Sequence, residues 1–231
     1  MQIGALGDIH GAFDTVHDIM TRHPDVPLWV QVGDIASNDG EYFEPIRPLF
    51  WIKGNNEDFD VIAAATNGHS PFPNLNYLPN GGAYVVGAWR VAALGGTFAP
   101  SWYHSPMASL PPSKGRRMTS TSMKLGKSRD DKRRHFVREE VLTCKALTAI
   151  DVFLTHEAPR PFHPAGKRID TGKTVINEVL ASMRPRLHLF GHHHEFTDSV
   201  RQGVRSIGLD LVTKSYLLID QDTLRCERLD T

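Results

Sequence analysis

The chain is poor in cysteine and carries no excess charge of either sign. Only two of its 231 residues are cysteines, Cys144 and Cys226, and they lie far apart. So few thiols exclude a disulfide-stapled scaffold and a thiolate metal site, and they fit a reducing compartment. Basic and acidic side chains number 26 each, which excludes binding of nucleic acid through overall charge. Attraction to a polyanion therefore requires a local basic patch.

Long apolar runs and a basic leader are missing as well. The apolar run that starts at Met1 ends at Asp8, and no stretch approaches the ~20 residues that cross a membrane. We therefore expect a cytoplasmic protein with no membrane partner. Hydrophobic residues make up 40% of the chain and charged residues 23%, ordinary values for a globular protein. The length suits one domain over residues 1–231 with a sizeable core.

The hydrophobic pattern predicts an α/β fold. Apolar residues at helical spacing predict helices at 12–20, 59–64 and 174–183. Short apolar runs predict strands at 3–6, 28–32, 50–52, 75–78, 83–86, 89–94, 150–155, 186–190, 204–209 and 215–219. Alternation of strand and helix with a β-rich middle and end predicts two packed sheets flanked by helices.

One segment, residues 101–138, differs from the rest. Prolines interrupt it, and residues 114–138 include ten basic residues but only two acidic ones before Arg138, Asp130 and Asp131. A helix is predicted from about Asp131 to Thr148. Two interpretations of the segment stay open, a solvated loop and a lid or polyanion-binding insert near the functional site.

Five of the apolar runs end in a small residue that is followed by a residue type able to bind metal. The residues in these positions are Asp8 with His10, Asp34, Asn55, His156, and His192 with His194. Because ligands in open α/β sheets gather past the carboxyl ends of the strands, we expect these side chains to meet at one edge. Carboxylate, amide and imidazole groups suit manganese, iron, zinc or nickel better than calcium, which prefers oxygen alone. The pattern predicts a polynuclear site, with manganese as the expected metal.

Such a site has a defined chemistry. Two metal ions ~3.5–4 Å apart share a bridging carboxylate, activate a water and hold phosphate oxygens as charge builds up. No Ser–His or Cys–His arrangement indicates a protein nucleophile.

The residues around these positions resemble the ordered blocks of calcineurin-like metallophosphoesterases. The blocks are Gly7-Asp8-Ile9-His10-Gly11, Gly33-Asp34, Gly54-Asn55-Asn56-Glu57, Thr155-His156-Glu157 and Gly191-His192-His193-His194. The resemblance implies a four-layer α-β-β-α sandwich of two mixed sheets with two divalent metal ions. It also implies the ligands: Asp8, His10 and His194 for one metal, Asn55, His156 and His192 for the other, and Asp34 as the bridge.

The chain departs from this family at one position. The family carries histidine, the proposed general acid, where this chain has Asn56. An amide can hydrogen-bond a phosphate oxygen but cannot protonate a leaving group at neutral pH. Since general acid catalysis contributes ~10²–10⁴-fold, we expect slow turnover or a good leaving group. Three histidines, His69, His104 and His193, stay open as substitutes.

A second resemblance concerns the substrate. Gly95-Gly96-Thr97, Trp102-Tyr103-His104, a polar insert and the run 150–160 are similar in layout to RNA lariat debranching enzymes. These are phosphodiesterases, although they often carry cysteine where this chain has Asp8. The resemblance favours a phosphodiesterase over a phosphatase and implies a nucleotide or nucleic acid, bound through 114–138, as one substrate class among phosphoesters. The alternative is a catalytically weakened binding or scaffold protein of the same fold, which Asn56 favours and the complete ligand set opposes.

Overall fold

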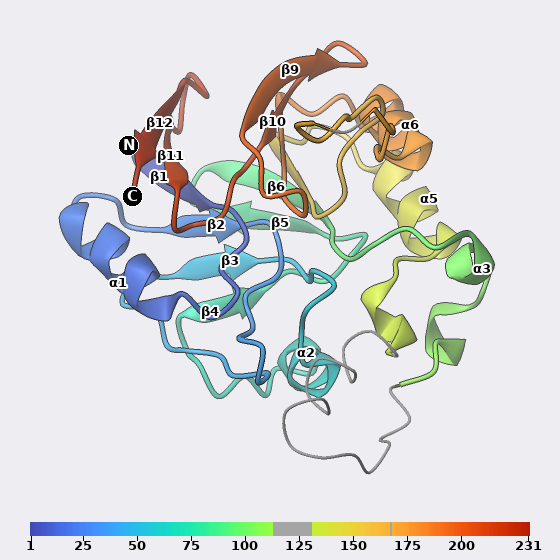
Figure 1. The fold of residues 1–231 in the computed structure, drawn as a ribbon, viewed down its shortest axis with the longest axis horizontal. Coiled ribbons are helices and arrows are strands. Elements are labelled where there is room, and N and C mark those ends of the chain that lie inside the picture. The colour runs from blue at the N-terminus through green and yellow to red at the C-terminus, as the bar shows by residue number, and fades with distance from the viewer. Residues whose placement is uncertain (113–130, 167) are drawn as a thin grey trace.

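The computed structural model describes residues 1–112, 131–166 and 168–231, which form two six-stranded sheets with helices on their outer faces (Figure 1). The first sheet has the order β12-β11-β1-β2-β3-β4. Its strands are β1 (Gln2–Leu6), β2 (Trp29–Gln31), β3 (Leu49–Trp51), β4 (Leu75–Tyr77), β11 (Ser215–Asp220) and β12 (Cys226–Asp230). The four strands from β1 to β4 run parallel, and β11 and β12 extend the sheet in antiparallel pairs.

The second sheet has the order β5-β6-β7-β8-β10-β9. Its strands are β5 (Ala83–Val86), β6 (Trp89–Leu94), β7 (Val152–Thr155), β8 (Leu187–Phe190), β9 (Thr197–Arg201) and β10 (Val204–Gly208). The inner strands run parallel, and β5 and β9 pair antiparallel at the two edges. Both sheets are therefore mixed, as predicted.

In the described part of the chain, the three larger apolar cores hold the layers together. The central core lies between the sheets and joins residues such as Ile3 of β1 and Leu154 of β7. On the outer face of the first sheet, α1 (Phe13–Arg22) and α2 (Phe59–Thr66) bury their apolar sides. On the outer face of the second sheet, α5 (Arg138–Ala146) and α6 (Thr174–Met183) do the same (Figure 1). The result is the predicted α-β-β-α sandwich, in which strands buried on both faces read as continuous apolar runs.

The predicted helix from Asp131 to Thr148 is wrong in its first part. The described ends of the segment form short helices, α3 (Pro100–Tyr103) and η1 (Met107–Ser109) before residue 113 and η2 (Lys132–Arg134) after residue 130, and α5 begins only at Arg138. The chain before α5 is extended because Phe136 N donates to Thr97 O (3.1 Å) and both Phe136 and Val137 are buried. Glu140 then accepts the Val137 N–H (2.8 Å) and starts the helix.

The predicted basic insert or lid at 101–138 is described only at its two ends. Residues 113–130 lie outside the described residues. The ends meet where Lys132 N donates to Pro111 O (3.0 Å). The returning end is attached to the loop after β3, because the buried Lys53 Nζ donates to the carbonyls of Arg133 (2.9 Å) and His135 (3.1 Å). In the part of the chain that the structure covers, no helix is long and apolar enough to cross a membrane.

Candidate metal centre

The residues predicted to bind metal all follow strands and lie beyond the carboxyl ends of those strands, on the same side of the two sheets. The first sheet positions those after β1, β2 and β3, and the second sheet positions those after β7 and β8. In this order they are Asp8 and His10, Asp34, Asn55, His156, and His192 with His194. Their side chains form two groups, each with donor atoms within 4.8 Å of one another, with Asn55 beside the second.

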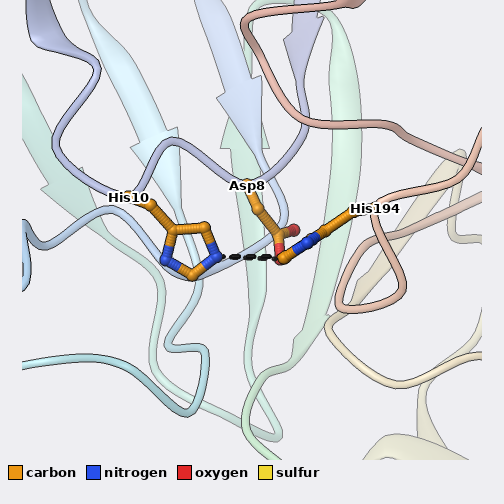
Figure 2. Close-up of side chains that lie close together, drawn as sticks. All are labelled: Asp8, His10 and His194. Atoms are coloured by element: carbon orange, nitrogen blue, oxygen red, sulfur yellow. Dashed lines mark hydrogen bonds and ion pairs between the residues drawn. The ribbon is translucent and has the colours of Figure 1, made fainter. Parts of the chain in front are cut away.

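The first group consists of Asp8, His10 and His194 (Figure 2). His194 Nε2 lies 3.0 Å from Asp8 Oδ2 and 3.1 Å from His10 Nε2. Asp8 is fully buried, and its other oxygen, Oδ1, accepts the His192 N–H (3.1 Å). Oδ2 is thereby left facing the two imidazoles, so one carboxylate and two ring nitrogens converge on one point.

The second group consists of Asp34, His156 and His192, with Asn55 beside them. His156 Nε2 lies 3.5 Å from Asp34 Oδ2, 3.1 Å from His192 Nδ1 and 3.2 Å from Asn55 Oδ1. The other ring nitrogen of His156, Nδ1, donates to Val32 O (2.8 Å). In the neutral ring this bond keeps the proton on Nδ1 and leaves the Nε2 lone pair directed into the group, as is typical of histidines that bind metal.

Asp34 connects the two groups. Its Oδ2 is 3.7 Å from His10 Nε2 in the first group and 3.5 Å from His156 Nε2 in the second. Burial alone would raise the pKa of Asp34, but the His156 and His10 imidazoles and the Asn56 N–H hold it below its usual range. Burial opposes charge on His156, yet the Asp34 carboxylate raises its pKa to about 10. Since a protonated imidazole cannot bind metal, a cation here would have to displace that proton.

The backbone at this edge is strained. His10, Asp34, His192 and His194 all have positive φ values, between 48° and 73°. Residues other than glycine seldom adopt this conformation, and such residues concentrate at functional sites. Two glycines allow close approach: a Cβ on Gly54 would overlap Asp34 Oδ1, and one on Gly191 would overlap Asp8 Oδ1. This explains why a small residue precedes Asn55 and His192.

The chain matches a known family over most of its length. Residues 1–196 match the family model described as calcineurin-like phosphoesterase. The chain belongs to this family. The match includes every block that carries the two groups of side chains, and it supports metal-dependent hydrolysis of a phosphoester.

Similar proteins agree with this assignment. The lariat debranching enzyme of Schizosaccharomyces pombe is 25% identical, over 85% of this chain and 49% of that protein. The chain thus spans about half the length of this relative. A solved structure from Thermus thermophilus has a TM-score of 0.67 at 13% identity, covering 99% of this chain and 98% of that one. A dimetal phosphatase from Danio rerio has a TM-score of 0.53 at 11% identity, covering 100% and 98%. For the two solved structures, identities of 13% and 11% establish only a shared fold.

Asn56 lies beside both groups of side chains. Its backbone N–H donates to Asp34 Oδ1 (2.7 Å), and its side-chain Nδ2 lies 3.3 Å from Ala36 O and 3.4 Å from His10 Nδ1. Of the three histidines left open as substitutes, His193 lies beside the second group, with its ring edge-on to that of His192 (centroids 4.8 Å apart). His193 also stacks on Phe162 (4.4 Å).

Two buried acids of the phosphoesterase blocks had no role in the sequence prediction. Glu57 accepts hydrogen bonds from the N–H groups of Ile35, Ala36 and Gly54, and from Tyr42 Oη. It thereby joins the loop after Asp34 to the loop before Asn55. Glu157 forms a third group with His192 and His193. Because Lys173 Nζ lies 3.5 Å from Glu157 Oε2, a cation already faces this carboxylate, and we assign no metal to the third group.

His188, for which the sequence suggested no partner, is a buried core residue behind the site. Thr155 Oγ1 donates to Glu157 O (2.7 Å) and accepts from His188 Nε2 (2.8 Å), while Ser206 Oγ lies 3.1 Å from His188 Nδ1. Burial lowers the pKa of His188 from 6.5 to about 3.

The His188→Gln variant is expected to reduce acid destabilisation. Between pH 6.5 and about 3 the unfolded chain binds a proton at His188 that the folded chain does not, so stability through this residue falls on acidification. Thermal unfolding midpoints measured over this range should fall less steeply in the variant. The exposed His163→Gln is the control and should follow the wild type. Parallel curves for wild type and His188→Gln would contradict the assignment.

Proposed function

We propose that this protein is a dinuclear metal-dependent phosphodiesterase. The observation that carries the proposal is the convergence of two carboxylates, four imidazoles and one amide oxygen beyond the carboxyl ends of strands from both sheets. In this proposal Asp8, His10 and His194 hold one ion, Asn55, His156 and His192 hold the other, and Asp34 bridges them. Because both sheets contribute ligands, we also propose that residues 1–231 act as one domain.

The donor set fits divalent cations. The two aspartates supply negative charge, and burial lowers the pKa of His192 to about 2, so its ring is neutral and its lone pair available. Manganese is the proposed metal, and iron, zinc and nickel accept the same donors. When bound, a metal pair supplies a water whose pKa is lowered towards ~7 and positive charge for phosphate oxygens.

The residues of the chain itself determine which leaving groups the reaction favours. Asp8 and Asp34 would hold the cations, and the Asn56 amide, next to His10, can donate a hydrogen bond to a phosphate oxygen. It cannot protonate the departing oxygen, so a leaving group that departs as an anion is favoured. No protein nucleophile is required.

A phosphodiester is the proposed substrate, with a nucleotide or nucleic acid as the first class to test. The similarity to a lariat debranching enzyme and the basic segment 114–138 support this choice. Within the described part of that segment, Arg133 is held by Asp131 (2.7 Å) and Asp60 (2.9 Å), so it serves to anchor the segment.

The test compares bis-p-nitrophenyl phosphate with p-nitrophenyl phosphate. We expect faster hydrolysis of the diester with added Mn²⁺ and loss of both activities with chelator. A preference for the monoester would contradict the diesterase assignment, and hydrolysis unaffected by chelator would contradict the metal dependence.

A second candidate function, a binding or scaffold protein, is supported by Asn56 alone. It predicts that the chain binds metal and phosphoester ligands and that the ligands are recovered intact. Turnover of either nitrophenyl ester would exclude it.

A further inference from the structure

Gln31 is a fully buried amide within an apolar strand, and the mechanism above gives it no role. It is the last residue of β2, next to Leu6 of β1 and Trp51 of β3 in the sheet register. An apolar side chain in this position would fill the core equally well, whereas a buried amide requires hydrogen bonds to balance its loss of water. Its partners therefore indicate why it is there.

The partners of Gln31 belong to the two loops that carry the aspartates. Nε2 donates to Gly7 O (3.1 Å) and to Gly33 O (2.5 Å), and Oε1 accepts from Gly33 N (2.7 Å). Gly7 immediately precedes Asp8, and Gly33 immediately precedes Asp34. Two carbonyls and one N–H around the amide fix its orientation, because only Nε2 can donate to the carbonyls.

Gly33 is the point where this contact matters most. Its φ of +98° is open to glycine, and a Cβ there would lie 2.7 Å from His156 Nδ1 and 2.8 Å from Gly54 Cα. The next residue, Asp34, has a φ of 62°. Gln31 binds both polar atoms of Gly33 and so holds the backbone bend that points Asp34 between the two groups.

We propose that Gln31 is a positioning residue that sets the separation of Asp8 and Asp34, and with it the spacing of the metal pair. This rests on the proposed dinuclear function. The amide is suited to the task because it offers donors and an acceptor without charge. Glutamate would place a carboxylate against two carbonyl oxygens, and methionine would leave Gly7 O, Gly33 O and Gly33 N without this partner.

The test uses Gln31→Met, which keeps the length of the side chain and removes its hydrogen bonds. Binding of the second Mn²⁺ should weaken by about 10–100-fold, as for other residues that orient metal ligands, and kcat should fall with it. KM for bis-p-nitrophenyl phosphate should stay near the wild-type value. With two equivalents of Mn²⁺, electron paramagnetic resonance should show isolated ions in place of the coupled pair of the wild type.

The control is Val179→Ala, a core truncation in α6 on the outer face of the second sheet. It should lower the thermal midpoint while retaining the coupled spectrum and wild-type Mn²⁺ affinity. Wild-type affinity and spectrum in Gln31→Met would overturn the proposal, as would equal loss of affinity in Val179→Ala at a similar thermal midpoint. Failure of the dinuclear function itself would show in the wild type, which would then bind fewer than two ions; that result would overturn both.

Discussion

Asp34→Asn should abolish phosphoester hydrolysis and lower the number of bound metal ions. Asp34 Oδ2 lies within 3.7 Å of His10 Nε2 and 3.5 Å of His156 Nε2, so one charge serves both groups. Asparagine keeps the shape of the side chain, and its oxygen can still accept the Asn56 N–H. The loss of activity should therefore reflect the missing negative charge. It should exceed the ~100-fold loss that is typical when a residue that only orients a metal ligand is changed.

The measurement is kcat/KM on the aryl diester together with metal content after dialysis against Mn²⁺. Asp18→Asn, on the exposed side of α1, is the matched control, and it should keep both values. Full activity or full metal content in Asp34→Asn would refute its bridging role.

Asn56→His is expected to raise turnover on diesters with poor leaving groups. The backbone N–H that binds Asp34 is retained in the variant, and the side chain lies beside His10, next to where phosphate would bind. A histidine there can protonate the departing oxygen, which contributes up to ~10²–10⁴-fold when fully effective.

The comparison that checks this uses two phosphodiesters of similar size, a methyl nitrophenyl phosphate and a dialkyl phosphate. The increase should be large for the alkoxide leaving group and small for nitrophenolate, which departs without a proton. Equal increases for the two substrates would argue that Asn56 does not occupy the acid position. Asn76→His, in β4, serves as the control for adding an imidazole elsewhere.

The elements predicted correctly are those whose own apolar pattern shows which of their side chains are buried. The strand β6 has the predicted bounds because it is apolar on both faces and buried between two cores, and the helix α6 has them because its apolar side fills one core. The strands β9 and β12 were missed because their sequences, TDSVR and CERLD, are mostly polar and lie half-buried or exposed at sheet edges. Their pairing is determined by the neighbouring strand and not by their own pattern.

The residues predicted to bind metal could be identified from the sequence more readily than the residues that hold their loops in position. Asp8, Asp34 and His156 follow obvious strands, so their meeting at one edge could be predicted from topology. Gln31 and Glu57 could not be assigned in this way, because a polar residue in a strand or loop shows its purpose only through distant backbone partners. One signal was available for Gln31: an amide between Val30 and Val32 in a run otherwise apolar.

The most direct test of the dinuclear account is the number of Mn²⁺ ions per chain at which hydrolysis of bis-p-nitrophenyl phosphate saturates. The chain would first be stripped with chelator and then titrated while bound metal and rate are followed together. The account predicts that activity appears with the second ion and saturates at two per chain. Activity that is complete in the stripped chain, or that saturates at one ion, would contradict it.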